Sequence, residues 1–470
     1  MLIRFFLLWF LAVHAVAAEL TITNARLLGS TDTTNIHIEA GRIVAMNGEP
    51  ARENTESIDV AGATVMPGLI DSHVHLQSVP GAAFRRDDAH TRRELMHHHL
   101  RGYLANGVTT VLDTAIAAEA LREVQAYLAH GGRGPRVLAL GPTFHNPGGY
   151  LDGDSLSDYW GPRWRASASR DDVLRLFDEY AEIDGIVGTK VAISYGIGGP
   201  IDTWDTHTPA MRAVIAEENA ARGASMYAHA TEERAVEIAL DMGIHALAHM
   251  IIEMPSAGLI ERMRASGVYV ITTISVLDSI GGREDQSRLV IPLVRMTVPD
   301  VELATARNPE AWTGFLTTLT LAANSWLPEL LARWLASAYF TLDMVEGELG
   351  NQFEILMALH RTGIPIVVGT DSGSWPHFLN LFHGPTTVRE MALMVRAGMA
   401  PMDVIASATR IPAEMLGISD DVGTIEVGKR ADLIVVHDDP LENIAALGEL
   451  DWVIQAGVAK RPADWMNMAR

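Results

Sequence analysis

Hydrophobic and polar positions alternate in short runs at both ends of the chain. Residues 20–28 (LTITNARLL) and 35–46 (NIHIEAGRIVAM) show a period of two, and the same character returns in residues 423–439 and 451–458. This alternation is typical of half-buried β-strands. The pattern therefore predicts a small β-sandwich-like domain that is built from both chain ends. Its two parts are expected over residues 19–66 and 423–470.

The long middle of the chain has a different pattern, in which short β-branched runs alternate with amphipathic stretches. The run ASMYAHA (224–230), for example, is followed directly by TEERAVEIALDM (231–242). About eight such β/α units in roughly 350 residues favour an α/β fold, a closed (β/α)8 TIM barrel, here expected over residues 67–422. A doubly wound open sheet is the alternative fold, but no GxGxxG sequence follows an early strand.

One interval of the barrel region is too long for an ordinary connection between a strand and a helix. It covers about residues 279–350 and contains the Trp-rich stretch 309–340. Pro328, Glu329 and Arg333 interrupt its apolar run, which argues against a membrane-spanning helix. We therefore expect a helical insertion that caps the barrel mouth, and no stable transmembrane anchor.

The first residues have the pattern of a secretion signal. Arg4 precedes the apolar run 5–13, and small residues follow up to Ala18. This arrangement predicts a signal peptide over residues 1–18 that is cleaved near Ala17 or Ala18, so that the mature protein is periplasmic or secreted. The alternative is an apolar helix that is buried in the domain.

Composition narrows the classes of function. The net charge is −22 and the chain has no basic run, so we expect no nucleic acid partner. A small-molecule substrate fits better, and a homo-oligomer is left open. The chain has 18 histidines and no cysteine, which leaves imidazole, carboxylate or a modified lysine as the strong metal ligands.

Two histidines form the first candidate metal site. In LIDSHVHL, His73 and His75 are two residues apart, so strand alternation directs both imidazoles to one face. At the C-terminal end of a barrel strand, such a pair can hold one ion. A chance pair of packed or solvated histidines is the alternative.

Four more polar residues stand at the ends of predicted strands. Lys190 ends a buried run in which an unpaired ammonium would be costly, and His229 and His249 end consecutive β/α units. Asp371 ends IPIVVGTDSG, which is expected to be the last barrel strand. Each has a structural alternative, such as a rim lysine, a packed histidine or a helix cap. Their joint placement at strand ends favours a metal site.

These motifs together resemble those of the amidohydrolase superfamily over essentially the whole mature chain. The ordered set is PGLIDSHVHL, Lys190, YAHA, LAHM, GTDSG and GTIEVGKRADLIVV. The resemblance is to the binuclear members and implies two divalent ions, with zinc favoured by the His-rich set. It implies that His73, His75 and Asp371 bind the more buried ion and that His229 and His249 bind the more exposed one. A carboxylated Lys190 would bridge the two ions.

The activity implied is that of an exported metal-dependent amidohydrolase. A metal-bridging hydroxide would attack an amide bond, and Asp371 would carry a proton to the leaving group as the catalytic residue. The same centre can serve an esterase, lactonase or phosphotriesterase, which remain alternatives. A non-catalytic binding protein is a third reading, although it would have no use for Asp371 beside a metal-bound water.

The subfamily resemblance is to prolidase-like exported enzymes that cleave dipeptides or N-acyl amino acids. Two loops depart from that pattern, FHNPGGYLDGD (144–154) and KVAISYGIGGP (190–200), so the substrate does not transfer directly. The triplet of residues 97–99 (HHH) lies on an expected outer helix and is excluded as a metal site. The candidate substrate contacts are Tyr150, Tyr195, His145, His377 and His383.

Overall fold

The computed structural model describes residues 19–48, 56–150, 164–196, 204–323 and 326–467. The predicted signal peptide, residues 1–18, lies outside the described residues and stays a prediction. Of the two loops that depart from the prolidase-like pattern, residues 151–154 and 197–200 also lie outside them.

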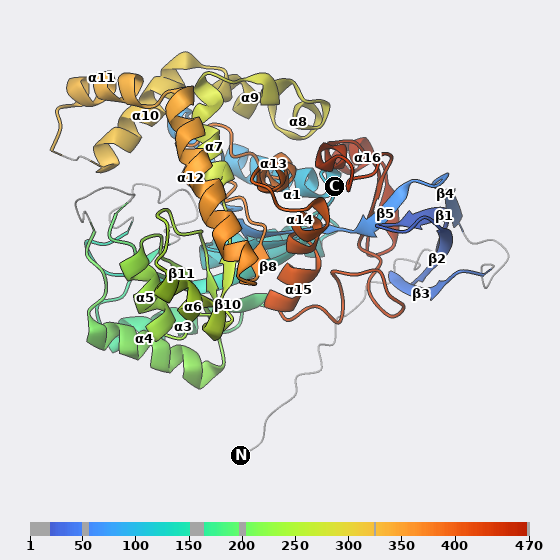
Figure 1. Ribbon diagram of the computed structural model, residues 1–470, viewed down its shortest axis with the longest axis horizontal. Helices are drawn as coiled ribbons and strands as arrows, with labels where there is room; N and C mark the ends of the chain where they lie inside the picture. Colours follow the sequence, from blue (N-terminus) through green and yellow to red (C-terminus); the bar gives the residue numbers. More distant parts are fainter. Residues whose placement is uncertain (1–18, 49–55, 151–163, 197–203, 324–325, 468–470) are drawn as a thin grey trace.

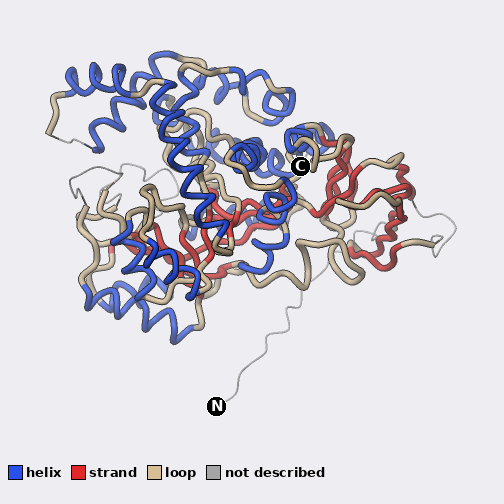
Figure 2. The backbone as a smooth tube through the Cα atoms, in the orientation of Figure 1, coloured by secondary structure: helices blue, strands red, loops and turns tan. Residues whose placement is uncertain are grey.

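The centre of the molecule is a parallel barrel, as the sequence predicted (Figures 1 and 2). Its strands follow one another around the sheet in chain order from β6 to β14, with the short β9 (Arg165–Ala166) paired at the edge of β8. The barrel strands are β6 (Leu69–Val74), β7 (Val108–Asp113), β8 (Arg136–His145), β10 (Ile186–Ala192), β11 (Ser225–His229), β12 (Ala246–Leu247), β13 (Tyr269–Ile271) and β14 (Ile366–Val367).

The last strand returns to the first and closes the barrel. Val74 and Ser372 form a parallel bridge, and the Ser72 amide donates to the Val368 carbonyl at 3.0 Å. Gly369 permits this approach, because a Cβ at that position would lie 2.7 Å from the Cβ of His73. The closure therefore brings the segment after β14 directly against the histidines of β6.

Each barrel strand is followed by a helix on the outside. In α5, for example, Ala235, Val236 and Ala239 are buried whereas Glu237 is exposed, which is the stripe of a helix that packs on a sheet. The (β/α)8 prediction is confirmed. The eight outer helices are α1 (Ala89–Ala105), α2 (Ala118–Ala129), α3 (Arg170–Tyr180), α4 (Pro209–Arg222), α5 (Glu233–Asp241), α6 (Ala257–Ser266), α12 (Leu342–Arg361) and α13 (Pro385–Arg396).

The two chain ends form a second, smaller sheet at one side of the barrel (Figure 1). The C-terminal strand β15 pairs antiparallel with β5 and so joins the two halves. Its strands are β1 (Leu20–Leu27), β2 (Thr33–Glu39), β3 (Arg42–Met46), β4 (Glu56–Asp59), β5 (Thr64–Pro67), β15 (Leu433–Val436), β16 (Leu450–Gln455) and β17 (Val458–Lys460). Short helices α14 (Pro401–Ser407), α15 (Arg410–Met415) and α16 (Pro462–Asn467) complete the C-terminal part.

The predicted insertion is helical and lies between β13 and α12. It packs through an apolar cluster on the loops that follow β6 and β14, with Phe84, Phe378 and Phe382 among the contacts. Among the described residues, none of the helices combines the length and the hydropathy that a bilayer crossing requires. The elements are α7 (Ser275–Ile280), α8 (Pro292–Thr297), α9 (Asp300–Ala306), α10 (Pro309–Ala323) and α11 (Glu329–Tyr339).

Candidate active site

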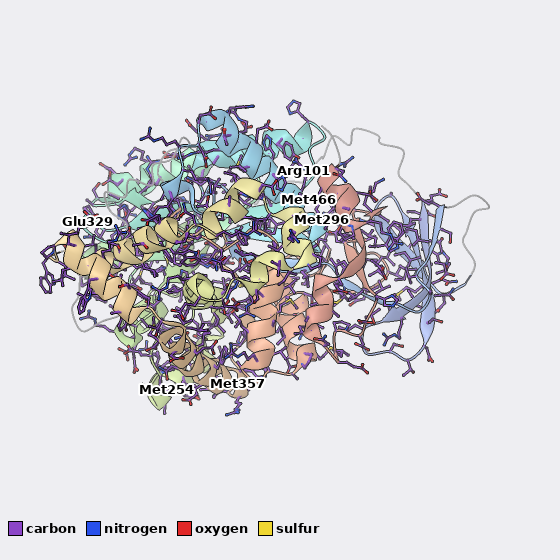
Figure 3. All side chains as sticks on the ribbon, turned by 90° about the horizontal axis from the view of Figure 1, so that it is seen from above. Arg101, Met254, Met296, Glu329, Met357 and Met466 are labelled. Atoms are coloured by element: carbon purple, nitrogen blue, oxygen red, sulfur yellow. The ribbon has the colours of Figure 1, made fainter. Side chains whose placement is uncertain are left out.

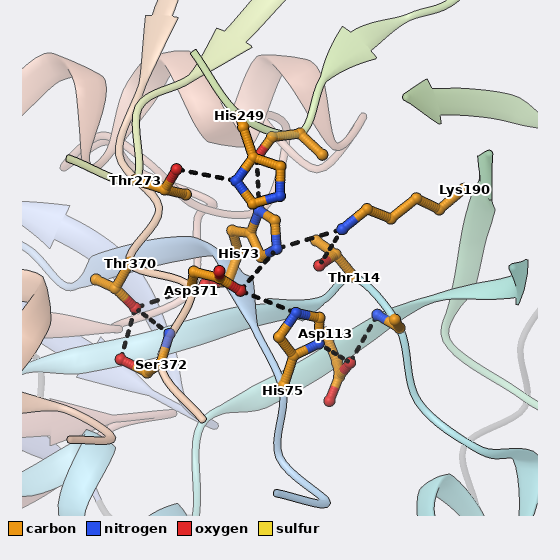
Figure 4. A network of polar contacts seen from close by, with 12 residues as sticks. His73, His75, Asp113, Thr114, Lys190, His249, Thr273, Thr370, Asp371 and Ser372 are labelled. Carbon is orange, nitrogen blue, oxygen red and sulfur yellow. Dashed lines mark hydrogen bonds and ion pairs between the residues drawn. The ribbon is translucent and has the colours of Figure 1, made fainter. Parts of the chain in front are cut away.

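The structure brings the predicted ligands together at the C-terminal end of the barrel. Each one belongs to a barrel strand or follows it within a few residues. Figure 4 shows His73, His75, Lys190, His249 and Asp371 directed toward one region. His229, the last residue of β11, joins them through its ring, whose centroid lies 4.5 Å from that of His249.

The imidazole of His73 has a fixed orientation. Its Nδ1–H donates to the carbonyl oxygen of Ala248 at 2.6 Å, directly after β12. Burial, and then the nearby ammonium of Lys190, lowers the pKa of His73 to about 4, so the ring is neutral. The Nε2 lone pair is therefore the atom that faces the centre.

The carboxylate of Asp371 lies against this lone pair. Its Oδ1 is 3.2 Å from His73 Nε2 and 2.9 Å from His75 Nε2. The backbone of Asp371 has a φ of 56°, an uncommon value outside glycine, and its amide donates to the His73 carbonyl at 2.8 Å. This backbone conformation turns the carboxylate back toward β6.

These atoms fit a divalent cation. A neutral imidazole nitrogen and an ionised carboxylate oxygen repel each other at 3.2 Å unless a positive centre lies beside both. Within the described residues, the buried Asp371 Oδ1 and the Nδ1 atoms of His75 and His229 have no hydrogen-bond partner, which is rare for buried polar atoms. Ligand atoms of His73, His249 and Asp371 lie within 4.8 Å of one another. The donor set of imidazoles and a carboxylate suits zinc and similar ions.

Lys190 extends the same cluster on the side of β10. Its side chain is fully buried, and Nζ lies 3.3 Å from His73 Nε2 and 3.2 Å from Thr114 Oγ1. The indole ring of Trp164 lies 5.3 Å from the same Nζ. Burial, and then Lys190, lowers the pKa of His229 well below its ordinary value. Lys190 thus borders the histidine cluster beside His73.

His249 is oriented by a loop that is itself held by a buried carboxylate. Its Nδ1 lies 3.0 Å from Thr273 Oγ1, and Thr273 has a φ of 53°. Glu390 of α13 accepts hydrogen bonds from the amides of Ile274 and Ser275 at 2.9 and 2.7 Å. Glu390 therefore acts as a positioning residue, because it keeps Thr273 in the conformation that directs His249 Nε2 inward.

Tyr150 is a predicted substrate contact that packs directly on the ligand cluster. Its ring stacks on His229 with centroids 4.1 Å apart. Trp164 and Trp204 contact the same ring edge-on, at 5.1 and 5.0 Å. An aromatic wall of these three side chains therefore borders the cluster.

The other predicted substrate contacts have mixed placements. The guanidinium of Arg234 lies 3.4 Å above the ring of Tyr195, which places a cation beside the loop after β10. His377 packs on Trp375, with ring centroids 4.2 Å apart. His145 is buried at the end of β8. His383 lies 2.9 Å from both Tyr103 and the Ser78 carbonyl through its two ring nitrogens, which leaves no ring nitrogen for a substrate.

The histidine triplet of α1 serves the fold. His97 stacks on Tyr127, His98 Nε2 lies 3.0 Å from the Thr297 carbonyl, and His99 Nε2 lies 2.6 Å from Glu302. The last two contacts attach α8 and α9 of the insertion to the barrel. The three rings therefore meet three different partners.

Sequence reasoning did not find several groups that shape the site. Thr114 and Thr273 each contact one ligand, and Glu390 holds the loop that carries Thr273. Isolated Thr or Glu residues carry no pattern that marks such a role. Trp164 and Trp204 stand in stretches of irregular sequence. Thr114 and Thr273 stand at the ends of predicted strands, and this position alone could have indicated that they lie near the site.

Curated relatives resemble parts of the chain. A dihydroorotase from Streptococcus pneumoniae is 29% identical over 114 residues, which are 23% of this chain and 25% of that protein. A D-hydantoinase from Geobacillus stearothermophilus is 26% identical over 179 residues, which are 37% of this chain and 32% of that protein. The matched stretches thus span a quarter to a third of these relatives.

A solved structure resembles nearly the whole chain. The crystal structure of a Xaa-Pro dipeptidase with bound methionine superposes with a TM-score of 0.69 at 22% sequence identity. The superposition covers 94% of this chain and 99% of that one, which shows a shared fold. The sequence model of the amidohydrolase family matches residues 64–459, from the last N-terminal strand of the small sheet through the barrel to β17. The chain therefore belongs to the amidohydrolase family, as its motifs indicated.

Proposed function

We propose that this protein is a metal-dependent hydrolase that cleaves an amide bond in a small molecule. The observation that carries the proposal is the approach of Asp371 Oδ1 to Nε2 of both His73 and His75, at 3.2 and 2.9 Å. Such a cluster of donor atoms at the mouth of a barrel suits a bound cation. Membership of the amidohydrolase family supports the same conclusion.

Two zinc ions are the proposed cofactors. His73, His75 and Asp371 would hold the more buried ion, and His229 and His249 would hold the second. A carboxylated Lys190 would bridge them. This assignment is supported by the position of Lys190 Nζ, 3.3 Å from His73 Nε2, because carboxylation replaces a buried cation among imidazoles by an anion with two oxygen ligands.

The residues of the chain have separate tasks in the proposed reaction. When bound, the ions lower the pKa of a water molecule and polarise the substrate carbonyl. Asp371 accepts a proton from the attacking water and transfers it to the departing nitrogen, which cannot leave an amide as an anion. Tyr150, Trp164 and Trp204 border the cluster and limit the access of bulk water.

The proposed substrates are dipeptide-like or N-acyl amino acids. The names of the relatives support cleavage of carbon–nitrogen bonds, since they include a dihydroorotase, a D-hydantoinase and a Xaa-Pro dipeptidase. Arg234 and Tyr195 at the rim offer a cation and a phenol for the polar end of such a molecule. An ester, a lactone or a phosphotriester is the alternative substrate for the same centre.

Export is part of the proposal and is supported by the sequence alone. Arg4, the apolar run 5–13 and the small residues up to Ala18 have the order of a signal peptide. The mature enzyme would act in the periplasm or outside the cell.

A substrate panel tests the proposed function. The mature protein, purified with zinc in the medium, is assayed with dipeptides, N-acyl amino acids, lactones and phosphotriesters. We expect kcat/KM for the best amide to exceed that for the best lactone or phosphotriester by about 100-fold or more. Hydrolysis of lactones or phosphotriesters without any amide hydrolysis would favour the alternative, and no turnover of any class by zinc-loaded protein would contradict an enzyme of this type.

A further inference from the structure

The tip of the insertion exposes an unusual group of large apolar side chains. Trp326, Leu330, Trp334 and Tyr339 are exposed by 75%, 85%, 64% and 61%. Among the described residues, every exposed large hydrophobic side chain that is aromatic lies in this segment. Scattered apolar residues on a surface need no explanation, but a contiguous aromatic patch marks an interaction site.

The helix α11 is apolar on two opposite faces. Its inner face packs along α10 through Ala332 and Ala336, which are buried. Its outer face carries Leu330, Leu331 and Trp334, at the spacing of a helix-packing stripe. A helix at the edge of a soluble monomer has a polar outer face, so the outer face of α11 lacks a partner.

The hairpin of α10 and α11 is anchored on the barrel by apolar contacts of α10. Trp312, Phe315 and Leu316 of α10 belong to the apolar cluster that contains Phe378 and Phe382 of the loop after β14. Figure 1 shows the hairpin extending away from the barrel, and Figure 3 shows Glu329 at the end of the molecule opposite the small sheet. A preorganised surface of this kind binds without a large ordering cost.

The charges favour another protein surface over a lipid surface. Arg333 is the only cation among the described residues of the hairpin, and it pairs with Glu310 at 3.4 Å. A membrane surface attracts helices that are rich in lysine and arginine, whereas this chain has a net charge of −22. Two copies of so acidic a protein repel each other over most of their surface, and the uncharged stripe of α11 is a place where they can meet.

The area is sufficient for the centre of an interface between two copies. The exposed parts of Leu330, Leu331 and Trp334 together offer on the order of 300 Å². A stable interface buries about 800 Å² on each partner, and its centre is apolar and aromatic while its rim is polar. Glu329, Arg333 and Ser337 flank the stripe and supply such a rim.

We propose that the outer face of α11 is the docking surface for a second copy of this chain. The interface is isologous, so that Leu330, Leu331 and Trp334 of each copy pack against the same stripe of the other. This inference is independent of the proposed hydrolase activity, since none of these residues belongs to the ligand cluster.

Sedimentation velocity of the full-length mature protein tests the docking surface. We expect the wild-type protein to be a dimer or a larger even-numbered assembly. Leu330→Glu and Trp334→Glu should each weaken the association by about 100-fold or more, because an isologous interface buries every new charge twice. Val427→Glu, an equally exposed apolar position in another part of the molecule, is the matched control and should leave the assembly unchanged.

Crosslinking gives a second measurement that does not depend on the charged variants. Because the chain has no cysteine, Ala338→Cys places a single thiol on the exposed face of α11. A short bis-maleimide should then link two chains, whereas Val427→Cys should remain unlinked. A monomeric wild-type protein, or an assembly that survives both charged variants, would overturn the proposal. Monomeric protein that sediments with phosphatidylcholine vesicles in a Trp334-dependent manner would assign the patch to lipid instead.

Discussion

Replacing Lys190 by alanine is expected to lower kcat/KM by more than about 100-fold, because loss of a ligand costs more than the 10–100-fold loss that follows from mutating its supporting partners. Lys190 is buried between His73 and Thr114 and is the proposed bridge between the two ions. Acetate or propionate should restore part of the activity, since a small carboxylate can occupy the place of the carbamate.

The control for this variant is Lys460→Ala in β17, outside the barrel. It should keep normal activity and metal content. Normal turnover of Lys190→Ala would show that the lysine is only a buried structural residue. A loss of activity without any rescue by carboxylic acids, in folded protein that retains both ions, would argue against carboxylation.

Replacing Asp371 by asparagine is expected to separate the ligand role of this residue from its proton-transfer role. Asparagine keeps a carbonyl oxygen that can bind a metal but has no carboxylate to carry a proton. We expect kcat/KM for an amide to fall by about 10²–10⁴ while much of the metal is retained. A nitrophenyl ester should be affected less, because its leaving group departs without a proton.

The measurement compares one amide and one activated ester in both proteins, with metal content determined in the same samples. The ratio of amide to ester activity should fall in the variant. An equal loss on both substrates, with the metal retained, would show that Asp371 does not protonate the leaving group.

The barrel and the order of its ligands could be predicted because each depends on a local pattern. The β-branched runs mark the strands, and a polar residue at the end of such a run lies at the barrel mouth whatever the exact bounds of the strand. The observed β12 and β14 are only two residues long. Beyond them the backbone bends to hydrogen-bond with β6, as the Asp371 amide does with the His73 carbonyl. Such bends depend on tertiary contacts, which a single sequence does not encode locally.

The supporting groups of the site could not be predicted for the same reason. Glu390 lies 117 residues beyond Thr273 in the sequence, and only barrel closure brings α13 to the loop after β13. His383 was expected at the substrate, yet its two nitrogens serve Tyr103 and Ser78. A loop histidine has several equivalent uses, so its role depends on neighbours that the fold supplies.

The insertion shows a similar limit. Its helical character and approximate position could be predicted from its apolar residues. It packs on loops at the barrel mouth, where a cap was expected. The exposure of Trp326, Leu330 and Trp334 could not be predicted from the sequence. An apolar helix can have the same sequence whether it covers a core or faces a partner.

The metal content of active protein tests the central claim most directly. Protein purified without chelator should contain close to two divalent ions per chain, mainly zinc, by elemental analysis. Removal of the ions with a chelator should abolish amide hydrolysis, and zinc should restore it. Full activity in protein that contains one ion per chain would contradict the two-metal assignment, and full activity in metal-free protein would contradict a metal-dependent hydrolase altogether.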